Sequence, residues 1–147
     1  MKKNIFYLIL LLFFTFIFSV FYIGLDKPNF YTPKEVKNNS LEEFTSKELF
    51  SNEQLNSKDI IENSKFTLVN IWSSWCVPCR LEHSVLMDLS EKTNLNIVGL
   101  NYKDKKNNAI KLLNELGNPF SKILTDPDGI ISISLGAYGV PETFLLN

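Results

Sequence analysis

The two cysteines of this 147-residue chain, Cys76 and Cys79, are separated by two residues. Two thiols at this spacing can close into a disulfide and open again, which is the chemistry of thiol–disulfide exchange. Pro78 suits the first turn of a helix, which would place the Cys76 sulfur beside unpaired backbone N–H groups. Such a position stabilises a thiolate and lowers the pKa of the Cys76 thiol. A structural pair is the alternative, so the surrounding sequence must decide.

The segments on either side of the cysteines predict a strand followed by a helix. The apolar, β-branched and aromatic run at 66–72 is typical of a strand buried on both faces. Apolar residues then recur at helical spacing over 78–92. The cysteines therefore lie just beyond a central strand and at the start of the next helix, where α/β folds commonly place chemistry.

The rest of the chain continues this alternation. The further predicted elements are a strand at 95–102, a helix at 109–116, short strands at 120–124 and 143–146, and a turn at 126–129. Gly117 supplies the stop of the second helix. Lys103-Asp104-Lys105-Lys106 reads as the solvated start of that helix. Strand, helix, strand, helix, strand is the order of parallel β-α-β units.

The N-terminal residues predict a membrane anchor. The uncharged run at 5–25 is long enough to cross a bilayer. It lacks the small-x-small site of a cleaved signal peptide, which favours an uncleaved signal anchor. Lys2 and Lys3 bias the N-terminus to the cytoplasm. We therefore expect one span in the inner (cytoplasmic) membrane, with the rest of the chain in the periplasm.

Size and charge narrow the classes of protein further. The length allows one domain of ordinary size plus an anchor or tail. Basic and acidic residues are nearly balanced, 15 against 16, so the sequence offers no basic field for nucleic acid. We expect no nucleic-acid partner. Polar residues at 28–64, with scattered prolines and asparagines, predict a tether that leads into peripheral structure.

Four segments together resemble the thiol:disulfide interchange protein of cytochrome c maturation, the CcmG/DsbE family of thioredoxin-like proteins. They are Asn-Ile-Trp-Ser-Ser-Trp-Cys-Val-Pro-Cys-Arg-Leu-Glu-His at 70–83, Val-Gly-Leu-Asn-Tyr-Lys-Asp at 98–104, Leu-Gly-Asn-Pro-Phe at 116–120 and Gly-Ala-Tyr-Gly-Val-Pro-Glu-Thr-Phe at 136–144. The resemblance covers about residues 66–147. It implies a thioredoxin-like α/β fold, a mixed sheet flanked by helices, behind the N-terminal transmembrane helix.

The resemblance also implies a function and roles for particular residues. It implies a periplasmic protein that keeps the haem-attachment cysteines of apocytochrome c reduced, itself re-reduced by an integral membrane thiol carrier. Carried over, Cys76 is the nucleophile, Cys79 the resolving thiol and Pro141 a cis-proline that faces the disulfide. The backbone at Val140 and Pro141 would bind an extended partner peptide, with Trp75 shaping the groove. No cofactor is expected.

Two further expectations concern the thiols themselves. Cys79, one turn into the helix, should be the less accessible sulfur. Ordinary thioredoxins carry an aspartate where this chain has Asn70, which cannot titrate. Glu82, one turn beyond Cys79, and Glu142, directly after Pro141, are the candidates to handle the proton. The alternative is that both glutamates are exposed bystanders.

Other functions are less well supported by the sequence. A closed zinc site needs four ligands, and beside the two cysteines the chain offers only His83. Haem attachment needs His directly after the second cysteine, where this chain has Arg80. The remaining alternatives are a general periplasmic thiol–disulfide exchange protein and a copper-delivery module, whose cysteines are usually spaced by three residues.

Three parts are predicted in all: a signal anchor at 1–27, a tether and peripheral structure at 28–64, and a thioredoxin-like domain at 65–147. Relatives continue beyond the strand at 143–146 with a further strand and a helix. We therefore expect the C-terminal strand and helix of the fold to be missing from this sequence.

Overall fold

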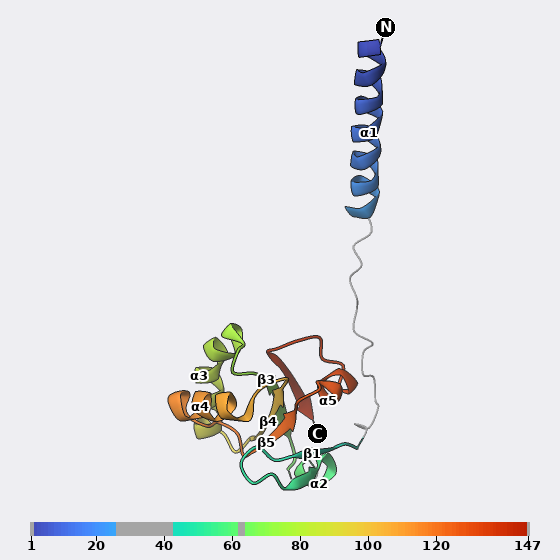
Figure 1. Cartoon of the computed structure of the whole chain (residues 1–147). Coiled ribbons are helices and arrows are strands. Elements are labelled where there is room, and N and C mark those ends of the chain that lie inside the picture. Colours follow the sequence, from blue (N-terminus) through green and yellow to red (C-terminus); the bar gives the residue numbers. More distant parts are fainter. Residues whose placement is uncertain (1, 26–42, 62–63, 147) are drawn as a thin grey trace. The chain divides into compact units, whose positions relative to one another are not determined.

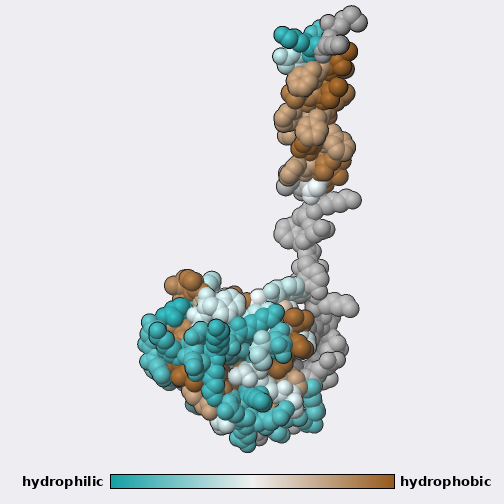
Figure 2. Space-filling model, in the orientation of Figure 1, coloured by the Kyte–Doolittle hydropathy of each residue, from teal (hydrophilic) through white to brown (hydrophobic). Residues whose placement is uncertain are grey.

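The computed structural model describes residues 2–25, 43–61 and 64–146, and the chain divides into two units, Met1–Glu35 and Val36–Asn147. Of the tether and peripheral structure predicted at 28–64, residues 28–42 and 62–63 therefore lie outside the described residues. The first unit contains helix α1 (Lys2–Leu25), and its stretch Lys3–Gly24 has a mean hydropathy of 2.5. In Figure 2 this helix is apolar along most of its visible face and hydrophilic at its N-terminal end. Its length and composition suit a membrane span, and a signal sequence would share both.

A four-stranded mixed sheet forms the centre of the second unit. Its strands, in the spatial order β5-β4-β3-β6, are β3 (Thr67–Trp72), β4 (Asn96–Tyr102), β5 (Lys122–Asp126) and β6 (Glu142–Leu146). Strand β4 runs parallel to both β3 and β5, whereas β6 is antiparallel to β3. The parallel strands therefore end at one edge of the sheet, and the cysteine segment follows β3 at that edge.

Helices cover both faces of this sheet. They are α2 (Ser57–Ile61), α3 (Val77–Lys92), α4 (Lys106–Leu116) and α5 (Ile130–Ser134). Figure 1 shows α3 and α4 together on one side of the strands and α5 on the other. Side chains along β3 point alternately to the two faces of the sheet. Leu68 and Trp72 pack in the apolar cluster between the sheet and helices α3 and α4, called here the α3 and α4 cluster. Val69 and Ile71 pack in the apolar cluster on the other face. Burial on both faces explains why β3 and β4 read as nearly continuous apolar runs.

A short hairpin completes the described part of the second unit. Its strands, β1 (Thr45–Lys47) and β2 (Gln54–Asn56), pair antiparallel. The Leu49 N–H donates to the Ile123 carbonyl at 2.8 Å, and the Leu49 side chain is fully buried in the α3 and α4 cluster. The hairpin therefore joins the main core beside β5.

The sequence-based elements agree with the structure in kind, with two differences. The predicted strand at 120–124 is displaced, because β5 begins at Lys122 and Phe120 instead stacks on Trp72 from the preceding loop. The turn at 126–129 leads directly into helix α5, which the prediction missed. Gly117 ends α4 as expected, and its φ of 93° is one that favours glycine.

Candidate functional site

The two cysteines form a disulfide at the start of α3. Cys76 is the N-cap of this helix, and its sulfur accepts a hydrogen bond from the Cys79 N–H at 3.1 Å. Pro78 occupies the first turn, as predicted, where its missing N–H costs no helical hydrogen bond. The Cys76 sulfur therefore lies at the positive end of a 16-residue helix, which favours a thiolate there once the disulfide opens.

The exposed fractions of the two whole residues are nearly equal, so they do not distinguish Cys79 as the less accessible cysteine. Cys76 is 3% exposed and Cys79 is 4% exposed in the disulfide form. Both belong to the core cluster beneath α3 and α4. The asymmetry between the cysteines is instead one of helix position, because the N-cap sulfur receives the backbone N–H.

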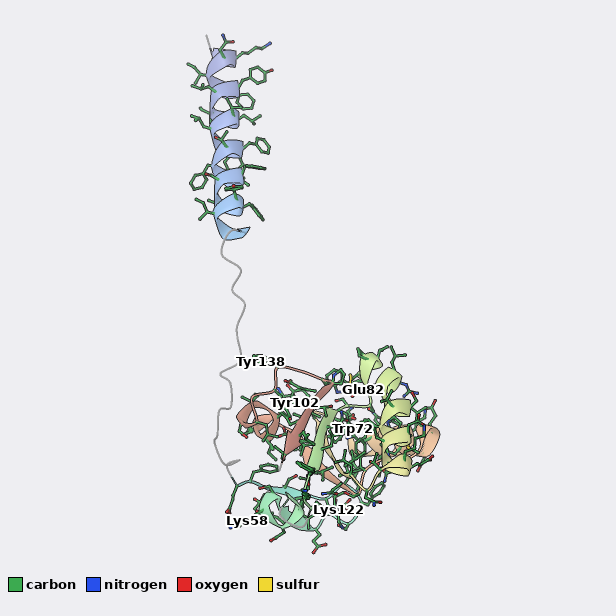
Figure 3. The ribbon with its side chains drawn as sticks, turned by 180° about the vertical axis from the view of Figure 1, so that it is seen from behind. Lys58, Trp72, Glu82, Tyr102, Lys122 and Tyr138 are labelled. Atoms are coloured by element: carbon green, nitrogen blue, oxygen red, sulfur yellow. A yellow bond between two sulfur atoms is a disulfide. The ribbon has the colours of Figure 1, made fainter. Side chains whose placement is uncertain are left out.

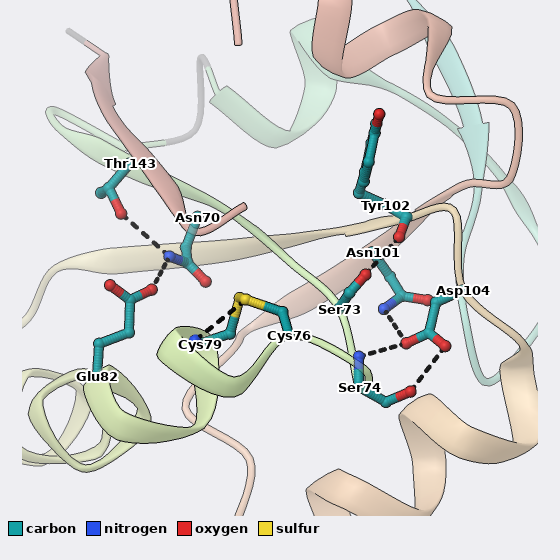
Figure 4. The surroundings of a disulfide bond; sticks show 10 residues. All are labelled: Asn70, Ser73, Ser74, Cys76, Cys79, Glu82, Asn101, Tyr102, Asp104 and Thr143. Carbon is teal, nitrogen blue, oxygen red and sulfur yellow. Dashed lines mark hydrogen bonds between the residues drawn. A yellow bond between two sulfur atoms is a disulfide. The ribbon is translucent and has the colours of Figure 1, made fainter. Parts of the chain in front are cut away.

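Asp104 anchors the loop that carries the cysteines, a role that the sequence analysis missed. Its carboxylate accepts hydrogen bonds from the Ser74 N–H at 2.6 Å, the Ser74 hydroxyl at 2.7 Å and the Asn101 amide at 3.1 Å. Figure 4 shows these contacts between the ends of β3 and β4. Residues 103–106 do lead into α4, and Lys103, Lys105 and Lys106 are exposed, but Asp104 has the additional role of holding the cysteine loop. The sequence contained one signal for this role. Asp104 follows a predicted strand, and neighbouring parallel strands end at the same edge of the sheet.

Trp75 extends from the same loop toward solvent. Its side chain is 57% exposed, its Nε1–H donates to the Lys103 carbonyl at 3.0 Å, and its ring lies 6.5 Å from that of Tyr102. These contacts fix an aromatic surface directly before Cys76. Trp75 is thus an exposed aromatic side chain held in place next to the disulfide.

The segment before β6 supplies the predicted proline. The Val140–Pro141 peptide bond is cis, and the Val140 side chain packs against both core clusters. The carboxylate of Glu142 accepts a hydrogen bond from the Tyr138 N–H at 2.9 Å, which closes the loop around this bond. Glu142 is paired with Ile71 of β3, so its side chain starts from the sheet face opposite α3.

Glu82 occupies a different place, between α3 and the sheet. Its carboxylate accepts a hydrogen bond from the Asn70 amide at 2.9 Å, and the same amide donates to the Thr143 hydroxyl at 3.0 Å. Figure 3 shows Glu82 on α3 and Trp72 on the sheet. Along α3, Glu82 follows Cys79 by three residues, about one helical turn. The structure therefore brings Glu82, and not Glu142, into a hydrogen-bonded group with Asn70, which Figure 4 shows beside Cys79.

His83 faces away from this group. Its Nε2 lies 3.0 Å from the Gly117 carbonyl oxygen, and its buried ring packs edge-on to Phe120. Among the described residues no cluster of three or more His, Cys, Asp or Glu side chains could hold a metal ion. The chemistry that the described site offers is a thiol pair, a buried amide and a carboxylate.

Comparison with known proteins gives this geometry a context. The Redoxin family profile matches residues 36–147. The thiol:disulfide interchange protein CycY of Rhizobium leguminosarum bv. viciae is 50% identical over 89 residues, 60% of this chain and 48% of that protein. The chain thus spans about half the length of that relative.

A second relative is similar over almost the whole chain. The probable thiol:disulfide interchange protein DsbE-2 of Pasteurella multocida is 33% identical over 146 residues, which is 99% of this chain and 76% of that protein. Among solved structures, the thioredoxin domain of a thiol-disulfide oxidoreductase from Bacteroides vulgatus matches with a TM-score of 0.61 and 17% identity, covering 74% of this chain and 79% of that one. The second unit therefore has a thioredoxin-like α/β fold, as predicted.

Proposed function

Because the chain belongs to the Redoxin family, and within it to the thiol:disulfide interchange proteins of the CcmG/DsbE type, we propose that it reduces protein disulfides with its Cys76–Cys79 pair. The observation that carries the proposal is the position of this pair. The two sulfurs lie at the N-terminus of α3, with Cys76 as the helix cap, and the hydrogen-bonded Asn70–Glu82 pair lies beside Cys79 in Figure 4. A purely structural disulfide has no need of this arrangement.

The reaction proceeds in two exchanges. The Cys76 thiolate attacks one sulfur of the partner's disulfide, forms a mixed disulfide and releases the partner's other sulfur as a thiolate, which takes up a proton. The Cys79 thiol then loses its proton and attacks the Cys76 sulfur, which releases the second partner thiolate. The partner gains two electrons, and the chain, having lost two, is left with the Cys76–Cys79 disulfide.

Cys79 needs a proton acceptor in the second exchange, and we assign that role to Glu82. Its carboxylate lies one helical turn from Cys79 and is held by the Asn70 amide. Glu142 has a different assignment. Its contact with the Tyr138 N–H supports the loop around Pro141, and we propose that Trp75, Val140 and Pro141 line the site for an extended partner peptide.

The location and partners form the finer part of the proposal. Helix α1 would anchor the chain in the inner membrane, with the second unit in the periplasm. The client would be the haem-attachment cysteines of apocytochrome c. A dithiol of an integral membrane thiol carrier would return the pair to its reduced state. The CycY and DsbE names of the relatives support the role in cytochrome c maturation, and the apolar helix supports the anchor. The thiol carrier follows only from the resemblance to the CcmG/DsbE family.

Trapping identifies the client. In membranes that contain the full chain with Cys79→Ser, the mixed disulfide on Cys76 cannot be resolved and should accumulate. We expect mass spectrometry to find a Cys-x-x-Cys-His peptide linked to Cys76. The matched control is the Cys76→Ser chain, which keeps one thiol and should trap far less. Linkage to many unrelated proteins would instead support a general exchange protein, and no linkage at all would contradict the proposed reduction.

A further inference from the structure

Asn70 contains a buried oxygen atom that has no partner among the described residues. The Asn70 side chain is fully buried on β3, and both hydrogens of its amide nitrogen are used, by Glu82 and Thr143. Its Oδ1 has no hydrogen bond. A buried acceptor without a donor is unfavourable and uncommon in proteins, so this oxygen needs a physical explanation.

The orientation of the amide follows from its neighbours. An ionised Glu82 carboxylate offers only acceptors, so the NH₂ group of Asn70 must face Glu82 and its oxygen must face the other way. Asn70 lies between Leu68 and Trp72 in the alternation of β3, on the sheet face that also packs against Cys79. Figure 4 shows the Asn70 oxygen turned toward the cysteine pair.

We propose that Asn70 is a positioning residue whose oxygen accepts a hydrogen bond from the Cys79 S–H in the reduced protein. In the disulfide neither sulfur carries a hydrogen, so the oxygen is left unpaired. When a dithiol donor supplies two electrons, the S–S bond breaks and Cys79 takes up a proton. That proton then points to Asn70, while Cys76 keeps the N–H of the helix terminus. This inference depends on the proposed redox cycle of the pair.

The contact would separate the two thiols chemically. Hydrogen bonding to an S–H favours the neutral form of Cys79, while the helix terminus favours the thiolate of Cys76. The proposed contact would also hold the Cys79 proton close to Glu82. The Asn70 side chain donates to Glu82 through its nitrogen and would accept from Cys79 through its oxygen. Because the bond exists only in the dithiol, its loss in Asn70→Leu should shift the exchange equilibrium with glutathione toward the disulfide by up to about tenfold, or about 30 mV.

The S–H stretching band of Cys79 tests the contact directly. In the full chain with Cys76→Ala, Cys79 is the single thiol, and no sulfur or hydroxyl at position 76 competes as an acceptor. We expect the Raman band of the reduced protein to lie at the low frequency of a hydrogen-bonded thiol. Adding Asn70→Leu should move the band to the frequency of a free thiol. The control Thr143→Val removes a different contact of Asn70 and should leave the band in place.

A free-thiol band in the Cys76→Ala chain would overturn the inference, even if the Asn70→Leu chain failed to fold. A bonded band that Asn70→Leu did not move would overturn it equally. The proposed function has a separate test, because a parent chain that reduced no protein disulfide would contradict that function whatever the position of the S–H band.

Discussion

At the scale of single residues, Asp104 ties the end of β4 to the loop before Cys76. Replacing Asp104 with Asn keeps its shape and removes one of the two acceptor oxygens that hold Ser74. Because hydrogen bonds to charged groups contribute about 1.5–3 kcal/mol, we expect the Asp104→Asn chain to lose about 1–2 kcal/mol in its free energy of unfolding. Denaturant titration of the reduced and oxidised forms measures this loss.

The matched control for Asp104→Asn is Asp88→Asn. Asp88 is an exposed carboxylate on α3 whose side chain pairs with Lys92 one turn later. Such surface pairs contribute little, so this change should stay within about 0.5 kcal/mol of the parent. Equal losses in the two variants would show that the contacts of Asp104 do not stabilise the cysteine loop.

The proposed role of Glu82 leads to a prediction about the rate of the second exchange, also at the scale of single residues. Without its carboxylate, Cys79 lacks the proposed proton acceptor, so Glu82→Gln should slow resolution of the mixed disulfide on the order of 100-fold near neutral pH. Stopped-flow release of a fluorescent thiol measures this step. Glu91→Gln, a change at an exposed site on the same helix, is the control and should keep the parent rate. Equal resolution rates in the parent and in Glu82→Gln would remove Glu82 from the mechanism.

The sequence predicted the reacting residues better than the residues that hold them. The spacing of Cys76 and Cys79 and the proline between them are local features, so they could be interpreted without a fold. The contacts of Asp104 and Asn70 depend on which strands become neighbours, and these residues are 30 and 12 positions from their partners Ser74 and Glu82. The residue types around Asp104 do not indicate such a contact, and the only signal is its place after a strand whose parallel neighbour ends at the same edge of the sheet.

At the scale of elements, close packing between β4 and β3 depends on Gly99. A Cβ atom added there would lie 2.8 Å from Trp72 Nε1 and 3.0 Å from Phe120 Cγ. These two rings stack on each other with centroids 5.5 Å apart, which limits how far they can move. Overpacking of this kind costs about 1–3 kcal/mol, so we expect Gly99→Ala to lower the unfolding free energy by that amount.

Thermal or denaturant unfolding compares Gly99→Ala with a matched glycine. At Gly139 an added Cβ would meet nothing within 4 Å, so Gly139→Ala should stay within about 1 kcal/mol of the parent. If Gly99→Ala were as stable as Gly139→Ala, the packing of Trp72 and Phe120 against β4 would be looser than described.

Elements long enough to show a repeating pattern of apolar residues could be predicted from the sequence, and shorter elements could not. The buried runs of β3 and β4 and the repeats of α3 and α4 are long enough to show their type. Helix α5 spans only Ile130–Ser134, too few residues to display a helical period. Phe120 is apolar and buried outside β5, because it packs on Trp72 from a loop, and burial alone was mistaken for a strand.

At the scale of the whole molecule, the apolar helix α1 leads to a prediction about where the chain is located in the cell. A helix as apolar as Lys3–Gly24 should stay in the bilayer when salt and alkali remove proteins held only at the surface. We therefore expect the full chain to remain in the membrane pellet after alkaline extraction, alongside a known integral protein. Recovery of the full chain in the supernatant, with a peripheral marker, would contradict anchoring by α1.

The central claim is that Cys76 attacks and Cys79 resolves, and the order of attack can be measured with the purified full chain. Reduced Cys79→Ser and Cys76→Ser chains are each mixed with a disulfide-bonded peptide, and mixed disulfides are followed by mass spectrometry. Because only Cys76 caps α3, the Cys79→Ser chain should form the mixed disulfide at least about tenfold faster. Equal rates, or a faster reaction at Cys79, would contradict the account.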